Sequence, residues 1–236
     1  MGKTHFDFKK FTIYHDKCAM KVGTDGVLLG AWTEPLPGTS RILDIGTGSG
    51  LIAIMLAQKS DAEIIGIDLD DPAISQAEGN GRNTPWAHRL HFIQADASAF
   101  DPQSTFQLIV CNPPFFTESL QCPDSRRNDA RHSAALPFDV LVSRAANWLE
   151  ADGLLNVVLP AGQADGFVQK AWEHGLQLSD RCWVRTKPDT PPKRVLLSFR
   201  KGHAEYPSSK WLAIRKEDGC YTDEYKALTK DYYLNF

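Results

Sequence analysis

Residues 41–51 read Arg-Ile-Leu-Asp-Ile-Gly-Thr-Gly-Ser-Gly-Leu, and this stretch is the main sequence evidence for the fold. A short apolar run of strand length enters a glycine-rich turn, and residues 52–57 continue as a helix. Glycine lets backbone N–H groups approach a ligand closely. The stretch is not a dinucleotide fingerprint, because Leu51 stands where the third glycine belongs, and no Gly-Lys-Ser/Thr follows to make a P-loop. The order strand, turn, helix indicates an α/β protein with a nucleotide-type site at this turn.

The rest of the chain continues the alternation of apolar strands and helices. Further strands are expected at residues 63–68, 90–94, 106–111 and 153–160, with helices at 72–82, 137–149 and 163–173. Residues 176–184 and 195–199 are expected to close the sheet as an antiparallel hairpin. This pattern predicts a seven-stranded, mostly parallel sheet with helices on both faces. Asp68 ends the second strand about twenty residues after the turn, where a carboxylate can accept hydrogen bonds from ribose hydroxyls.

A second informative stretch ends the fourth strand, where Cys111 is followed by Asn112-Pro113-Pro114-Phe115. Proline has no N–H and a fixed φ, so the strand stops there and holds Asn112 at the sheet edge where open α/β proteins bind ligands. The Asn112 amide and a nearby proline carbonyl can accept both hydrogens of a planar exocyclic amine. Such contacts favour the pyramidal nitrogen that can attack. Phe115 can stack on the ring.

Together these motifs resemble the S-adenosylmethionine-dependent amino-methyltransferases. Asp44-x-Gly46-x-Gly48-x-Gly50 is similar to their first motif, and Asn112-Pro113-Pro114-Phe115 is similar to their Asn-Pro-Pro-aromatic motif. The resemblance implies a Rossmann-like class I methyltransferase fold, S-adenosyl-L-methionine as cofactor, and catalysis by residues 112–115. It implies that Asp44 faces the cofactor's ammonium through water or the loop, that Asp68 holds the ribose and that Asp96 lies near the adenine amino group. The other implied cofactor contacts are Gly46, Thr47, Gly48, Gly50 and Asn112.

A closer resemblance covers nearly the whole chain. Residues 21–32, Pro191-Pro192-Lys193-Arg194-Val195-Leu196-Leu197 and residues 221–231 are similar to the bacterial tRNA1(Val) (adenine(37)-N6)-methyltransferase family. That resemblance implies methylation of N6 of adenine-37, next to the anticodon, with tRNA(Val) as the expected partner. The family often has tyrosine at the position of Phe115; stacking survives this change, but a hydroxyl contact is lost.

Two basic segments are candidates for contact with RNA phosphates. Residues 117–136 form a long polar stretch with Arg126, Arg127 and Arg131, which is either a substrate loop or a solvated loop. Residues 181–201 carry seven basic residues and one acid, and the expected contacts there are Lys187, Lys193 and Arg194. The alternative for this second segment is a solvated edge strand protected by its charges.

Composition sets the remaining bounds. The 236 residues carry a net charge of -3, so RNA binding requires a local basic patch, and they suit one domain. We expect residues 1–38 to be an N-terminal cover, 39–201 the catalytic core and 202–236 a tail. The five cysteines have no zinc or redox spacing, which favours reduced thiols, no metal and a cytoplasmic protein. No signal peptide, membrane span or obligate protein partner is inferred.

Within the cover, short strands are expected at residues 11–14 and 19–22. A helix capped by Thr24 or Asp25 should follow, as a packed cover or as a lid over the cofactor.

Other functions stay open at this point. Protein glutamine N5-methylation uses the same Asn-Pro-Pro motif, although those enzymes usually carry a helical domain before the glycine turn. DNA adenine or rRNA guanine methylation is a second alternative, and DNA enzymes generally need an extra recognition domain. A catalytically idle RNA-binding module is the third, and the presence of both Asn112 and Asp68 argues against it.

Overall fold

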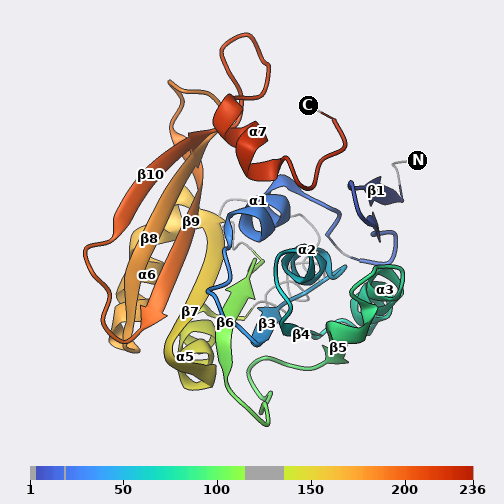
Figure 1. Cartoon of the computed structure of the whole chain (residues 1–236). Helices are drawn as coiled ribbons and strands as arrows, with labels where there is room; N and C mark the ends of the chain where they lie inside the picture. Colours follow the sequence, from blue (N-terminus) through green and yellow to red (C-terminus); the bar gives the residue numbers. More distant parts are fainter. Residues whose placement is uncertain (1–3, 19, 115–135, 236) are drawn as a thin grey trace, which may run out of the picture.

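The centre of the molecule is an eight-stranded sheet, seen in a computed structural model that describes residues 4–18, 20–114 and 136–235 (Figure 1). Its strand order is β10-β8-β9-β7-β6-β3-β4-β5. The central strands are parallel: β3 (Arg41–Ile45), β4 (Glu63–Asp68), β5 (Leu90–Gln94), β6 (Phe106–Cys111) and β7 (Leu149–Pro160). The expected hairpin is present as β8 (Leu176–Arg185) and β9 (Pro192–Lys201), which pair antiparallel. The mostly parallel α/β fold is therefore confirmed.

The strand register brings the sequence motifs to one edge of the sheet. Ile45 at the end of β3 pairs with Cys111 at the end of β6 and with Ile67 in β4. The glycine turn and Asn112 thus leave the carboxyl ends of neighbouring strands, which is where an open α/β sheet binds ligands.

Helices bury both faces of the sheet. On one face, α2 (Leu51–Lys59) lies in a hydrophobic core together with α1 (Thr24–Trp32) and α7 (Asp223–Thr229). On the other face, α5 (Phe138–Trp148) and α6 (Ala164–Glu173) pack in a second core (Figure 1). α3 (Asp71–Arg82) packs on β5, and short 3-10 helices occupy Ala87–Arg89 and Ala161–Gln163. Strands covered on both faces read as continuous apolar runs, which explains why β3 and β6 stand out in the sequence.

The sheet has one strand more than the predicted seven. β10 (Ser208–Ala213), in the segment expected to be a tail, pairs parallel with β8 at the edge. The sequence reads Ser-Ser-Lys-Trp-Leu-Ala, and only Leu212 is buried. An edge strand with so little inward surface lacks the apolar alternation from which strands are predicted.

The N-terminal segment also differs from expectation. β1 (His5–Asp7) pairs antiparallel with β2 (Thr12–Tyr14), whereas residues 20–22 form no strand. The predicted caps were wrong, because α1 starts at Thr24 with extended Gly23 as its N-cap and no side chain caps it. α1 is a packed cover: a Cβ on Gly30 would lie 2.7 Å from Met55 Sδ of α2. Among the described residues, no helix is long and apolar enough to cross a membrane.

Candidate active site

The glycine turn between β3 and α2 has a backbone that only glycine adopts readily. Gly46, Gly48 and Gly50 have φ of 71°, 55° and 80°, in the left-handed region. The turn is anchored to the neighbouring strand, because Gly46 N and Thr47 N both donate to Ile67 O, at 2.8 and 3.0 Å. A Cβ on Gly46 or Gly48 would meet no atom within 4 Å, so the outer side of the turn borders open space. The N–H groups of Gly46, Thr47, Gly48 and Gly50 all donate within the protein, so what these glycines offer a ligand is close approach to the turn.

Asp44 lies beneath this turn and holds its shape. The residue is 0% exposed, and its Oδ2 accepts hydrogen bonds from Thr47 Oγ1 at 2.7 Å and Ala53 N at 3.2 Å. Its Oδ1 is buried and has no hydrogen-bond partner in the part of the chain that the structure describes. Burial raises the pKa of Asp44 to about 7, against the opposing effect of the Thr47 and Ala53 hydrogen bonds. One carboxylate oxygen therefore serves the turn, and the other is available toward a cation.

Asp68 ties the second strand to the same turn. It stands at the end of β4 and is half-buried; Oδ2 accepts from Gly48 N at 2.8 Å and Oδ1 from Asp70 N at 3.0 Å. Each oxygen can accept further hydrogen bonds, since a carboxylate has about four acceptor positions. The sequence-predicted ribose acid thus lies against the glycine turn.

Asn112 lies directly after β6, the strand that pairs with β3. Its Oδ1 is buried and has no hydrogen-bond partner among the described residues. A buried, unpaired amide oxygen is costly, so one at a ligand-binding edge indicates a group that is satisfied by a ligand. Pro113 is buried and Pro114 is exposed, whereas Phe115 lies outside the described residues.

Asp96 follows β5 in a tight turn. It is exposed, its Oδ1 accepts from Ser98 N at 2.8 Å, and its backbone carbonyl accepts from Ala99 N and Phe100 N. Hydrogen bonds from the side chain and the backbone N–H of Ser98 lower the pKa of Asp96, and the charge of Arg144 lowers it to a smaller extent. The residue is an ionised turn former, and its contact with the cofactor stays a prediction.

Asn80 connects the N-terminal segment to the glycine turn, and the sequence reading missed it. The residue is 1% exposed on α3; its Nδ2 donates to Tyr14 O at 2.9 Å and Ser49 O at 2.8 Å, and its Oδ1 accepts from Tyr14 N at 3.0 Å. The available signal was an asparagine in register with the buried positions Ala73 and Ala77 of the same helix. A polar residue on the inner face of a helix needs a partner there.

The predicted RNA-binding residues fall into three groups. Lys187 pairs with Glu217 at 3.6 Å, and Arg194 pairs with Asp25 at 2.8 Å, so acids of this chain neutralise both. Lys193 is exposed beside them. The loop arginines Arg126, Arg127 and Arg131 lie outside the described residues.

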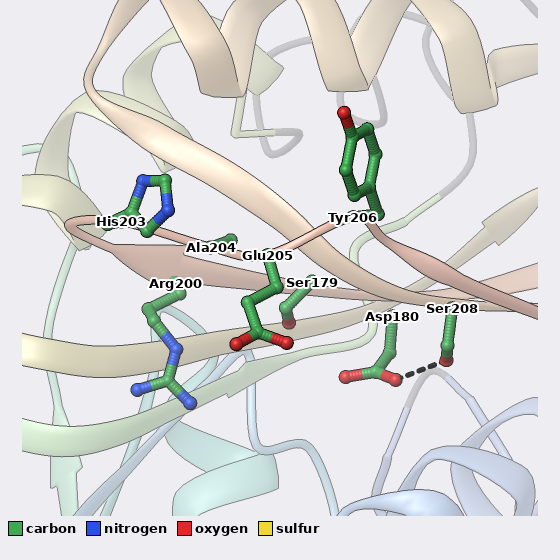
Figure 2. Close-up of a pocket in the computed structure, with 8 residues that line it drawn as sticks. All are labelled: Ser179, Asp180, Arg200, His203, Ala204, Glu205, Tyr206 and Ser208. Carbon is green, nitrogen blue, oxygen red and sulfur yellow. Dashed lines mark hydrogen bonds between the residues drawn. The ribbon is translucent and has the colours of Figure 1, made fainter.

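A surface pocket lies at the opposite edge of the sheet from these groups. Figure 2 shows the side chains that line it. It is lined by Ser179, Asp180, Arg200, His203, Ala204, Glu205, Tyr206 and Ser208. These residues come from the start of β8, the end of β9 and the segment leading into β10. Ser208 Oγ donates to Asp180 Oδ1 across it. The pocket is therefore separate from the candidate active site.

Comparison with known proteins agrees with this geometry. A family model described as a methyltransferase domain matches residues 42–132. The solved structure of a predicted O-methyltransferase from Agrobacterium tumefaciens superimposes with a TM-score of 0.67 at 16% identity, over 88% of this chain and 96% of that chain. Fold and site thus define an S-adenosylmethionine-dependent methyltransferase of the α/β class I fold.

Full-length relatives narrow the class. A tRNA1(Val) (adenine(37)-N6)-methyltransferase from Phocaeicola vulgatus is 46% identical over 235 residues, 100% of both chains. A protein of the same name from Klebsiella pneumoniae is 42% identical over 238 residues, 99% of this chain and 96% of its own. The chain belongs to the tRNA1(Val) (adenine(37)-N6)-methyltransferase family.

Proposed function

We infer that this chain methylates the exocyclic N6 of adenine-37, next to the anticodon, in tRNA(Val). The observation that carries this inference is the unpaired Asn112 Oδ1, held at the carboxyl end of β6 beside the glycine turn at the end of β3. Full-length relatives at 46% and 42% identity carry the same activity in their names, which supports the choice of target.

The residues around the turn suit S-adenosyl-L-methionine. The left-handed Gly46 and Gly48 leave open space where a side chain would stand, so a ligand can approach the turn closely, and Asp44 Oδ1 is a buried acceptor available to a cationic group. We propose that Gly46, Thr47, Gly48 and Gly50 surround the cofactor, that Asp68 accepts from its ribose hydroxyls, and that Asp96 lies near its adenine. When bound, this cofactor supplies an electrophilic methyl group.

Asn112 prepares the nucleophile. The lone pair of an aromatic amine is delocalised into its ring, so the nitrogen attacks poorly while it stays planar. Asn112 Oδ1 and a carbonyl of the following prolines hold the two amine hydrogens in the positions that suit a pyramidal nitrogen, and these contacts strengthen toward the transition state. Phe115 is proposed to stack on the everted base. No strong general base is required, because the methylated amine is acidic and loses its proton to water.

Asn112 and Asp68 are proposed as the residues that separate an active enzyme from an RNA-binding module. The cytoplasm is the proposed compartment. Cys18, Cys111, Cys182 and Cys220 are free thiols, as expected where thiols stay reduced. No metal and no obligate protein partner enter the proposal.

One experiment tests this function against methylation of another RNA base or of a protein glutamine. The protein is incubated with methyl-labelled S-adenosylmethionine and unmodified total tRNA, and the labelled nucleoside is identified and mapped. N6-methyladenosine at position 37 of tRNA(Val) is expected, and Asn112→Ala should slow its formation strongly. Label at another nucleoside, or label only in a protein fraction, would overturn the assignment.

A further inference from the structure

Two arginines and two tryptophans gather on one face of the sheet edge formed by β8 and β10. Arg181, Trp183 and Arg185 alternate along β8, and Trp183 pairs in register with Trp211 of β10. The two indoles stack, with ring centroids 6.1 Å apart and an interplanar angle of 29°. We call these four residues the Arg–Trp face.

Each arginine of this face lies over an indole ring. The Arg181 guanidinium carbon is 5.3 Å from the Trp183 ring centroid, and that of Arg185 is 5.2 Å from the Trp211 centroid. This stacking orders the guanidinium groups before any ligand arrives, which reduces the entropy lost on binding. The residues between them, Cys182 and Val184, point to the opposite face and are buried.

The charge on the Arg–Trp face is not neutralised by neighbouring acids. Where the structure describes the chain, neither Arg181 nor Arg185 forms an ion pair, and the Nε atoms of both find no hydrogen-bond acceptor. By contrast, Lys187, Arg194 and Arg200 of the same basic segment pair with Glu217, Asp25 and Asp152, respectively. Trp211 is 54% exposed, so one indole remains open to solvent.

The position of this face relates it to the candidate active site. Arg185 pairs with Pro192 at the end of the hairpin where β9 begins, and β9 pairs Arg194 with Pro160, the last residue of β7. Arg185 therefore lies at the same edge of the sheet as Asn112. Three strand spacings separate β8 from β6, a lateral distance of about 14 Å. The face thus runs along β8 from Arg181 to Arg185, toward the edge where the target base is proposed to bind.

We propose that the Arg–Trp face binds the tRNA substrate: Arg181 and Arg185 contact its phosphates, and Trp211 stacks on an unpaired base. Ordered guanidinium groups match phosphate oxygens, and an exposed indole beside them suits a base, so charge and shape both fit RNA. The proposal rests on the proposed function. Within residues 181–201, it assigns phosphate contact to Arg181 and Arg185 in place of Lys187 and Arg194, which have acidic partners.

The test is binding of unmodified tRNA(Val) transcript by fluorescence anisotropy at several salt concentrations. The double variant Arg181→Gln/Arg185→Gln should raise Kd about tenfold or more. The slope of log Kd against log salt concentration should also fall by about 1.5, because each lost phosphate contact removes about 0.7–0.9 from this slope. Trp211→Ala should raise Kd at least about fivefold, whereas Trp211→Phe should stay near the wild type, because stacking is retained.

Matched controls separate this face from general surface effects. Arg82→Gln on α3 removes an exposed arginine. Tyr206→Ala removes an exposed aromatic over which no arginine of the described residues lies. Both should bind tRNA as the wild type does. Cofactor affinity and Tm of the Arg–Trp variants should be unchanged; if the glutamine pair fails to fold, Arg181→Lys/Arg185→Lys keeps the charge and tests the stacked geometry alone.

A Kd within twofold of the wild type for both the arginine pair and Trp211→Ala would overturn the proposal. The two ideas fail separately. Tight tRNA binding through this face with no methylated adenine-37 counts against the proposed function. Methylation of adenine-37 with unchanged tRNA Kd in these variants counts only against the face.

Discussion

Gly48 donates its backbone N–H to Asp68 Oδ2 at 2.8 Å, so the glycine turn of one strand is held by the acid at the end of the next strand. The same carboxylate is the proposed ribose ligand. Binding of the cofactor and the conformation of the turn are therefore coupled through one side chain.

Asp68→Ala removes both roles at once. We expect S-adenosylmethionine to bind about 1–3 kcal/mol more weakly, the usual result of deleting a charged hydrogen-bond partner. Isothermal titration calorimetry measures this directly, and Asp70→Ala is the matched control on the same loop. Unchanged affinity in Asp68→Ala, with loss in Asp70→Ala, would move the ribose contact to Asp70.

Asn80 is expected to stabilise both the N-terminal segment and the turn. Asn80→Ala leaves the N–H and carbonyl of Tyr14 and the carbonyl of Ser49 without their partner, which should cost about 1–3 kcal/mol of unfolding free energy. Cofactor affinity should fall as well, because Ser49 belongs to the glycine turn. Denaturant unfolding and calorimetry check the two effects, with exposed Asn83→Ala as control. A loss of stability with full cofactor affinity would show that Asn80 anchors the N-terminal segment only.

Asp44 should make the free energy of unfolding depend on pH. Its folded pKa, about 7, exceeds the unfolded value of about 3.9, so the folded state holds the proton longer and the stabilising contribution of Asp44 is lost as pH rises from about 4 to about 7. Asp44→Asn cannot titrate and keeps an amide oxygen for Thr47 and Ala53. The wild type should therefore lose stability relative to Asp44→Asn as pH rises from about 4 to about 7. Parallel stability curves from denaturant unfolding at a series of pH values would contradict a raised pKa.

Lys193 and Arg194 are expected to behave differently although they are adjacent. Lys193→Glu should weaken tRNA binding and flatten its salt dependence while Tm stays constant, because this exposed side chain is free to meet phosphate. Arg194→Glu should lower Tm, since it places a carboxylate against Asp25. Thermal unfolding and salt-dependent tRNA binding of the two variants measure the contrast. If Lys193→Glu leaves the salt slope intact, this end of the hairpin is a solvated edge.

The sequence predicts the parts of the molecule whose signal is local. The buried strands β3 and β6 read as apolar runs, and their motifs follow directly in the chain, so the glycine turn, Asp68 and Asn112 were placed correctly at one edge. Partners that depend on distant segments escaped prediction. Arg194 meets Asp25 across 169 residues, and Trp183 meets Trp211 only because β10 adds to the sheet. Local periodicity carries no information on such pairings, so the basic segment appeared uniform until the structure separated its charges.

The account depends most on Asn112, and single-turnover methylation with saturating cofactor and saturating unmodified tRNA(Val) tests it most directly. Asn112→Ala should lower the rate of methyl transfer by about 10²–10³, the usual effect of removing one preorganised group from the transition state, with little change in the affinity for either substrate. Asn112→Ala methylating adenine-37 at the wild-type rate would contradict the mechanism and reduce Asn112 to the end of a strand.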